Sequence, residues 1–279
     1  MSDMDRRRFA ECAAAFAAVL ASGAPARAAQ DAAAAPPPHD MSAMPAHWMG
    51  EEKIAFLIYP GFTALDMIGP HYMLANLMGA TIEIVAKTKE PVRSDAGLVV
   101  TPTATFETAS SPLDVVCIPG GSLGTLAAMR DDATLDFLRA AGRKARHVTS
   151  VCTGSLLLGS AGLLDGYRAT SHWVTKPLLP IFGAVPADGR VVRDRNRITA
   201  EGVTAGLDFA LALVAQLRDQ TYAEGVQLLA QYAPEPPFAA GAPETAPPAV
   251  TKMIDGMFVG LRRDMREAGA AAFARSRGG

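Results

Sequence analysis

The sequence has few aromatic residues, few cysteines and almost no net charge. Phe, Trp and Tyr make up 6% of its 279 residues, three residues are cysteine, and the formal net charge is −2 at pH 7. A chain without strong positive charge has no electrostatic reason to bind a nucleic acid or an anionic membrane, so we expect a substrate that is not a polyanion. Its apolar content of 49% is typical of a globular protein with a packed core.

The N-terminal apolar stretch is too short and too rich in small residues to span a membrane. Three arginines at 6–8 precede it, and Ala-Arg-Ala at 26–28 follows it in the small-x-small pattern of a cleavage site. The arginine pair is typical of a twin-arginine signal, although Asp5 stands where Ser or Thr is usual. We predict that residues 1–28 export the protein to the periplasm. The alternative is a disordered arginine tail on a cytoplasmic protein.

Residues 29–50 are rich in Ala, Pro and Met and have no helical or strand period, which predicts a linker or an arm laid over the domain. Loose spacing and intervening prolines favour a plain tether over a site for a soft metal such as Cu(I). Residues 51–279 form the predicted single domain with a C-terminal helical tail. The residues of the linker that could hold such a metal are His39, Met41, Met44, His47 and Met49.

Removal of the signal would also remove Cys12 and leave two cysteines, Cys117 and Cys152. Two cysteines in an oxidising compartment can pair. Cys117 lies in a run that predicts a buried strand, however, and Cys152 lies at the end of another strand. A disulfide needs Cα atoms within about 7 Å and convergent side chains, so we expect two free thiols.

From residue 53 onward, short apolar segments alternate with amphipathic ones. Near-continuous apolar runs of this length are expected of strands covered on both faces. The alternation predicts a doubly wound α/β sandwich with a mostly parallel sheet. Residues 92–107 predict a short antiparallel excursion, and 232–249 predict a proline-broken loop before a last helix that starts near Val250. The predicted strands lie within 53–62, 80–87, 113–121 and 146–152, and the predicted helices within 69–79, 123–145 and 204–219.

Cys152 is the first candidate for chemistry. The segment SVCTG has the form of a nucleophile elbow, a tight strand-to-helix turn that needs small neighbours, and Gly154 and Ser155 supply them. The positive end of the helix dipole stabilises a thiolate at a helix start, so we expect Cys152 to have a lowered pKa and to be a thiolate at neutral pH. The alternative is a buried structural cysteine.

Glycines at the same sheet edge are candidates for substrate binding. Ligands of open α/β sheets bind beyond the carboxyl ends of the strands. Gly120 and Gly121 follow the predicted strand 113–121 and offer backbone amides for an oxyanion-type pocket, and we assign Gly69 to the same role. The alternative for the Gly-Gly pair is a simple turn.

Three more side chains are candidate catalytic groups. Asp66, among apolar neighbours, is either the N-cap of the following helix or an acid with a raised pKa that moves a proton near Cys152. Thr153 can donate a hydrogen bond into the pocket or cap the helix. His172, which follows a short apolar segment, can orient the thiolate or move protons, or it is simply packed beside Trp173.

Taken together, these motifs resemble the DJ-1/PfpI superfamily and, more narrowly, its isonitrile hydratase branch. The similarity spans roughly residues 53–248. The segments that carry it are the strand ending in PGF, ALDMIGPHYML, LDVVCIPGG, VTSVCTGSLLLGSAGLLDGYRATSHW, VVRDRNRITAEGVTAGLDFALALVAQL and VQLLAQYAPEPPF.

The resemblance implies a flavodoxin-like sandwich of the class I glutamine amidotransferase type, a homodimer, and no metal or organic cofactor. By motif match, Cys152 takes the place of the essential cysteine, Asp66 of its acidic partner, and Thr153 of the threonine beside the cysteine. The proteases of the superfamily have histidine after the cysteine, so Thr153 argues against peptidase activity.

The chemistry implied is the addition of water to an isonitrile, R-N≡C. In this hypothesis the Cys152 thiolate attacks the terminal carbon while protonated Asp66 supplies a proton. A water activated by ionised Asp66 then hydrolyses the thioimidate to an N-substituted formamide. Thr153 and the amides of Gly120 and Gly121 would hold the adduct or the water.

Two other functions stay open from the sequence. One is a glyoxalase-like or deglycase-like attack of the thiolate on a reactive aldehyde, with His172 as the proton carrier. The other is a redox sensor or holding chaperone in which Cys152 is oxidised to a sulfinate. A ligand-sensing transcriptional regulator is not favoured, because no helix-turn-helix pattern follows the domain.

Overall fold

The computed structural model describes residues 44–278, and the described residues from Pro45 onward form one compact unit. The predicted signal peptide at 1–28, most of the predicted linker and Cys12 lie outside the described residues. The predicted boundaries of signal and linker therefore stay predictions.

A seven-stranded sheet in the order β10-β11-β7-β6-β1-β2-β5 forms the centre of the domain. Every neighbouring pair is parallel except β10 and β11, which are antiparallel. This arrangement confirms the predicted doubly wound α/β fold. The strands are β1 (Lys53–Leu57), β2 (Thr81–Ala86), β5 (Ala104–Thr105), β6 (Val115–Ile118), β7 (His147–Val151), β10 (Val191–Asp194) and β11 (Arg197–Ala200).

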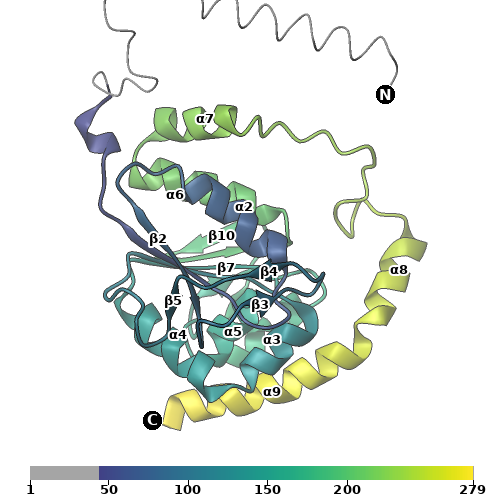
Figure 1. The fold of residues 1–279 in the computed structure, drawn as a ribbon. Coiled ribbons are helices and arrows are strands. Elements are labelled where there is room, and N and C mark those ends of the chain that lie inside the picture. The colour runs from purple at the N-terminus through teal and green to yellow at the C-terminus, as the bar shows by residue number, and fades with distance from the viewer. Residues whose placement is uncertain (1–43, 279) are drawn as a thin grey trace, which may run out of the picture. The chain divides into compact units, whose positions relative to one another are not determined.

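Helices cover both faces of the sheet, and every residue of the central strands β6 and β7 is buried. On one face, α2 (Ala64–Leu74) packs on α6 (Ala205–Leu217), which also contacts α7 (Gln220–Leu229). On the other face lie α3 (Ser122–Met129), α4 (Asp132–Lys144), α5 (Gly154–Ser160) and the long α9 (Val259–Gly278), as Figure 1 shows. Strands covered on both sides need no polar face, which explains the apolar runs.

Several predicted elements differ in detail from the structure. The predicted helix 123–145 is two helices, because the Asp131 carboxylate accepts a hydrogen bond from the Thr134 amide at 3.3 Å and starts α4 as its N-cap. The predicted excursion is confirmed as the antiparallel pair β3 (Val92–Arg93) and β4 (Val99–Val100). Strand β10 and helix α7 have no counterpart among the predicted elements.

The C-terminal tail contains two helices, where the sequence predicts one. Helix α8 (Pro248–Met257) begins two residues before the predicted start and is followed by Phe258 as its C-cap. Helix α9 then packs against α3, α5 and the 3-10 helix η2 (Lys176–Phe182). No helix among residues 44–278 is long and apolar enough to cross a membrane.

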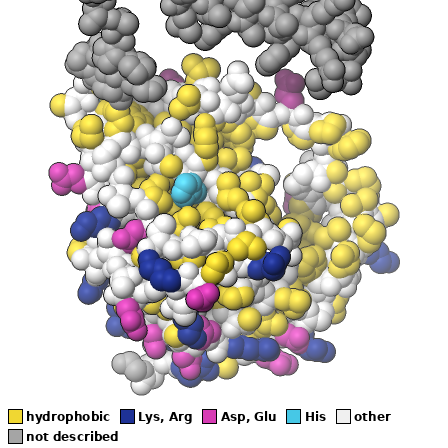
Figure 2. All heavy atoms as spheres, viewed as in Figure 1, with side chains coloured by type: hydrophobic (Ala, Val, Ile, Leu, Met, Phe, Trp, Pro, Cys, Tyr) yellow, Lys and Arg dark blue, Asp and Glu magenta, His cyan; other side chains and the backbone are white. Residues whose placement is uncertain are grey.

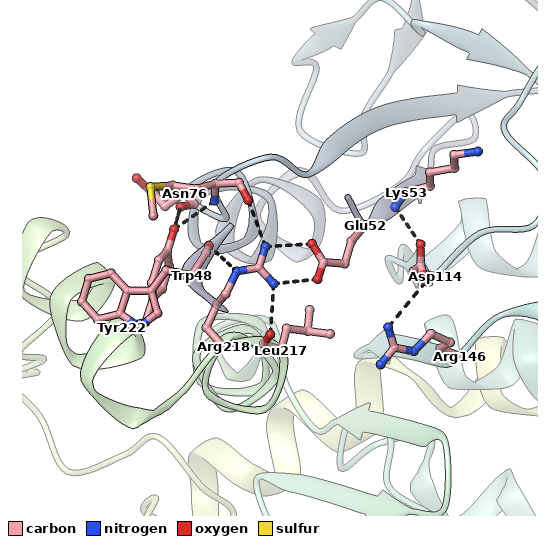
Figure 3. Close-up of polar contacts among 10 residues, drawn as sticks. Trp48, Glu52, Lys53, Asn76, Asp114, Arg146, Leu217, Arg218 and Tyr222 are labelled. Carbon is pink, nitrogen blue, oxygen red and sulfur yellow. Dashed lines mark hydrogen bonds and ion pairs between the residues drawn. The ribbon is translucent and has the colours of Figure 1, made fainter. Parts of the chain in front are cut away.

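The end of the predicted linker is held against the domain by polar contacts. The Trp48 indole donates to the Asp219 carboxylate at 2.7 Å, and His47 lies 2.6 Å from the same carboxylate. The Arg218 guanidinium donates to the Trp48 carbonyl at 2.6 Å and to both carboxylate oxygens of Glu52, an arrangement visible in Figure 3. This short stretch therefore lies as an arm on the domain, and within residues 44–278 no cluster of three or more His, Cys, Asp or Glu could hold a metal.

Candidate active site

Cys152 occupies the turn between β7 and α5, with the geometry expected of a nucleophile elbow. Its φ is +57°, a value that residues other than glycine seldom adopt. A side chain at Gly154 would collide with the Ile118 carbonyl of the neighbouring strand, so the turn needs glycine there. The hydroxyls of Ser155 and Ser171 donate to the Cys152 carbonyl at 3.2 and 3.1 Å and hold the turn in place.

The structure does not support the expectation that Cys152 is a thiolate at neutral pH. Cys152 is 7% exposed, and burial together with the negative charge of Asp66 raises the pKa of its thiol well above the ordinary value. The helix α5 that follows has only seven residues, and burial outweighs any stabilisation that its first turn provides. The resting state is therefore a thiol, and a nearby base must take its proton before the sulfur attacks.

Asp66 lies in the first turn of α2 and is 1% exposed. It does not cap this helix, because Thr63 occupies the N-cap position, and one Asp66 carboxyl oxygen, Oδ2, accepts from the Gly120 amide at 2.8 Å. The other oxygen, Oδ1, is buried and has no hydrogen-bond partner among residues 44–278. Burial raises the pKa of Asp66 to about 7, so this carboxyl can hold or release a proton near neutral pH.

The amides of Gly120 and Gly121 do not serve the expected oxyanion role. The Gly120 N–H donates to Asp66, and the Gly121 N–H donates to the Thr153 hydroxyl at 3.0 Å. Each amide has only one proton, so both donors are already used. They hold the catalytic candidates in place and leave no donor for a developing oxyanion.

Gly120 is nevertheless required by the site. A Cβ at this position would lie 2.6 Å from Thr153 Oγ1 and 2.9 Å from Asp66 Oδ2. The missing side chain therefore lets Asp66 and Thr153 both lie close to the backbone of Gly120. Gly69, in contrast, lies on the side of α2 that packs on α6, where the nearest neighbour of an added Cβ would be Leu207 at 3.4 Å.

Thr153 is held by two hydrogen bonds. Its hydroxyl accepts from Gly121 and lies 2.8 Å from the Thr125 hydroxyl. It occupies the N-cap position of α5, but its side chain makes no capping hydrogen bond. Thr153 is therefore tied to the glycine loop and to α3 and does not cap its own helix.

His172 lies next to Ser171, which contacts Cys152, but none of the contacts of residues 44–278 joins His172 itself to the thiol. Its ring lies 5.9 Å from the Trp173 ring and 6.5 Å from the Phe258 ring, between centroids. Burial lowers the pKa of His172, so the imidazole is neutral near pH 7. A catalytic role for His172 stays a prediction.

Sequence reasoning missed three polar side chains at this site, Tyr59, Thr125 and Ser171. The Tyr59 hydroxyl donates to the Pro119 carbonyl at 2.7 Å and lies 3.0 Å from the Thr125 hydroxyl. No sequence spacing connects residues 59, 125 and 153, because different strands and helices bring them together. The other described cysteine, Cys117, is a buried free thiol in β6, and burial raises its pKa to about 12.

The comparison with protein families decides the identity of the domain. The model of the DJ-1/PfpI family matches residues 52–216. The chain belongs to the DJ-1/PfpI family. Among similar DJ-1/PfpI proteins is the isonitrile hydratase of Pseudomonas putida, which is 51% identical over 198 residues, or 71% of this chain and 86% of that protein.

Solved structures of DJ-1/PfpI proteins agree with the fold. A THiJ/PfpI family protein from Pseudomonas syringae superimposes with a TM-score of 0.80 and 52% identity, over 86% of this chain and 98% of that one. DJ-1beta from Drosophila melanogaster matches with a TM-score of 0.60 and 24% identity, over 66% and 100% of the two chains. The second likeness supports the fold of this DJ-1/PfpI chain and nothing further.

Proposed function

We propose that this protein is an isonitrile hydratase, which adds water to an isonitrile and releases an N-substituted formamide without a cofactor. The observation that carries the proposal is the buried pair of Cys152 and Asp66, a thiol beside a carboxyl whose pKa is about 7. The 51% identity to the isonitrile hydratase of Pseudomonas putida, over most of that protein, supports this substrate class.

The first step joins the thiol to the isonitrile. Asp66 takes the Cys152 proton and passes it to the isonitrile, and the thiolate sulfur bonds to the terminal carbon of R-N≡C. The product is the thioimidate R-N=CH-S-Cys152, in which the former thiol proton is on carbon. A carboxyl with a pKa near 7 suits this step because it can accept and release the same proton near neutral pH.

The second step releases the formamide. Ionised Asp66 takes a proton from water as the water oxygen bonds to the thioimidate carbon, and the proton passes to nitrogen. The carbon–sulfur bond of R-NH-CH(OH)-S-Cys152 then breaks, the carbonyl forms, and the hydroxyl proton returns to sulfur through Asp66. The balance is one isonitrile and one water consumed, and one formamide and the free thiol produced.

The structure offers less support for the alternatives. A glyoxalase-like reaction with His172 as proton carrier would need that imidazole at the thiol, and its ring contacts are to Trp173 and Phe258. Redox-sensing cysteines are exposed and have a low pKa, whereas Cys152 is buried and its pKa is raised.

A substrate panel tests the proposal. Purified protein is given cyclohexyl isocyanide or methylglyoxal, and the loss of each compound and the formation of N-cyclohexylformamide are measured. We expect formamide from the wild type and from Cys117→Ala, the matched control in which the other buried thiol is removed, and none from Cys152→Ala. Formamide production that persists in Cys152→Ala would show the mechanism to be wrong.

We also propose that the protein is a homodimer, supported by an apolar face of α2. Leu65, Ile68 and Tyr72 lie on one side of this helix and are each more than 40% exposed. Figure 2 shows apolar side chains gathered on this face of the molecule. Light scattering of the wild type should give twice the monomer mass, and Ile68→Asp should give the monomer mass. A wild-type monomer would contradict the assignment.

We further propose export to the periplasm through residues 1–28. Cell fractionation with sequencing of the mature N-terminus tests it. The wild type should be found in the periplasm and begin after Ala28, whereas a double Lys variant of Arg6 and Arg7 should stay in the cytoplasm.

A further inference from the structure

Three buried hydroxyl groups form a chain that leads away from Cys152. The chain begins at the Gly121 amide, 3.0 Å from Thr153 Oγ1, and continues over 2.8 Å to Thr125 Oγ1. It then runs 3.0 Å to the Tyr59 hydroxyl and ends at the Pro119 carbonyl, 2.7 Å further on. The segments that supply these groups lie far apart in the sequence, and all three side chains are buried.

The two ends of this chain fix the direction of every proton in it. The Pro119 carbonyl can only accept, so the single Tyr59 proton points to it. Tyr59 must then accept from Thr125, because its own proton is used, and Thr125 in turn must accept from Thr153. The Gly121 amide can only donate, and it donates to Thr153. Burial raises the pKa of Tyr59, so its hydroxyl keeps this proton.

The Thr153 proton therefore points toward α3 and away from the thiol. Of the two Thr153 lone pairs, one accepts from Gly121, and the other is left for the site. This differs from the expectation that Thr153 donates a hydrogen bond into the pocket. A hydroxyl turned in this way can accept a hydrogen bond from water or from the Cys152 thiol, and it would have to turn away from Thr125 before it could donate to a thiolate.

We propose that Tyr59 and Thr125 are positioning residues that hold Thr153 as a hydrogen-bond acceptor, so that Thr153 and Asp66 together orient the water that hydrolyses the thioimidate. The role of the water rests on the proposed isonitrile hydratase function, whereas the direction of the Thr153 proton does not. Thr153 keeps one lone pair that Gly121 does not use, and Asp66 keeps Oδ1, which has no hydrogen-bond partner among residues 44–278, so these are the two acceptors to which the water donates.

Thr125→Val tests the chain with a side chain of nearly the same shape that cannot accept a hydrogen bond. Without its acceptor, the Thr153 proton turns toward Cys152, where it stabilises the thiolate. We expect the apparent pKa of Cys152 to fall by about one to two pH units, as a hydrogen bond to a charged group does. We also expect kcat to fall about tenfold and KM to change little, because the substrate itself is not contacted.

The pKa is measured without any substrate. The rate of Cys152 alkylation by iodoacetamide is followed against pH by peptide mass spectrometry, which separates Cys152 from the other cysteines. The titratable groups that face Cys152 are Asp66, from α2, and the buried Tyr59, and Asp95 acts on both of these groups. Thr125→Ser, which restores the hydroxyl, is the matched control and should behave as the wild type.

Tyr59→Phe is the second variant, and it stands in for Thr125→Val if that variant does not fold. Phe removes the hydroxyl that accepts the Thr125 proton. The Thr125 hydroxyl then donates to Thr153, so the Thr153 proton is again free to turn toward the thiol. A Cys152 pKa that stays the same or rises in both variants would overturn the proposal. If the pKa falls as expected while the wild type does not hydrate isonitriles, the proton chain stands and the proposed function fails.

Discussion

Gly120→Ala is the substitution for which the geometry of the site most clearly predicts a loss of activity. A Cβ at residue 120 would lie 2.6 Å from the Thr153 hydroxyl oxygen, 2.7 Å from the Thr153 amide nitrogen and 2.9 Å from the Asp66 carboxyl oxygen. Ordinary van der Waals contact begins near 3.4 Å, so these atoms must move by about 0.5–0.8 Å. The backbone at Gly120 is not in the left-handed region, so the cost arises from lost space alone.

The displacement separates the two groups that the proposed reaction uses. A misplacement of about 1 Å can cost about 100-fold in rate, which corresponds to about 3 kcal/mol of transition-state stabilisation. We therefore expect kcat/KM for cyclohexyl isocyanide to fall about 100-fold in Gly120→Ala, with the fold retained by circular dichroism.

The matched control for this substitution is Gly225→Ala in α7, where an added Cβ meets nothing within 4 Å. This variant should keep full activity and gain about 0.5–1 kcal/mol of stability, because Ala is the better helix former. Full activity in Gly120→Ala would refute the requirement for close approach of Asp66 and Thr153.

The remaining predictions concern stability. Folding keeps the proton on Asp66 up to about pH 7, whereas an unfolded chain loses it near 3.8, so the free energy of unfolding should decline as pH rises from about 4 to 7. The decline should reach about 4 kcal/mol at most and be absent in Asp66→Asn, as urea unfolding at several pH values can measure. Arg218→Met leaves the carboxylate of Glu52 buried without its partner, so the free energy of unfolding should fall by about 3 kcal/mol while kcat stays unchanged. A fall below about 1 kcal/mol would contradict the stabilising role of this ion pair.

Much of the fold could be predicted from local patterns, because the central strands are buried on both faces and appear as apolar runs. The sequence therefore predicts the strands β1, β2, β6 and β7. Strand β10 is short and carries the charged residues Arg193 and Asp194, so it lacks such a run. Helix α7 begins directly after the end of α6, at the Asp219 cap, and no separate apolar period marks it.

The candidate site could be predicted only in part, because pattern identifies residues and not their hydrogen-bond partners. The elbow at Cys152 depends on a local turn and small neighbours, and the structure has that turn. The use of the Gly120 and Gly121 amides by Asp66 and Thr153 depends on the meeting of α2, β6 and α5, which no local spacing describes.

By itself the sequence determined the α/β class and the elbow that holds Cys152, since these follow from local apolar pattern and small neighbours, whereas the choice of Asp66 and Thr153 as its partners came from the resemblance to the DJ-1/PfpI superfamily. Only the tertiary structure decided that the thiol rests protonated, that Asp66 has a pKa of about 7 and that the Thr153 proton points away from the site. The physical reason is that protonation and proton direction depend on burial and on partners from distant segments, and these exist only once the chain has folded.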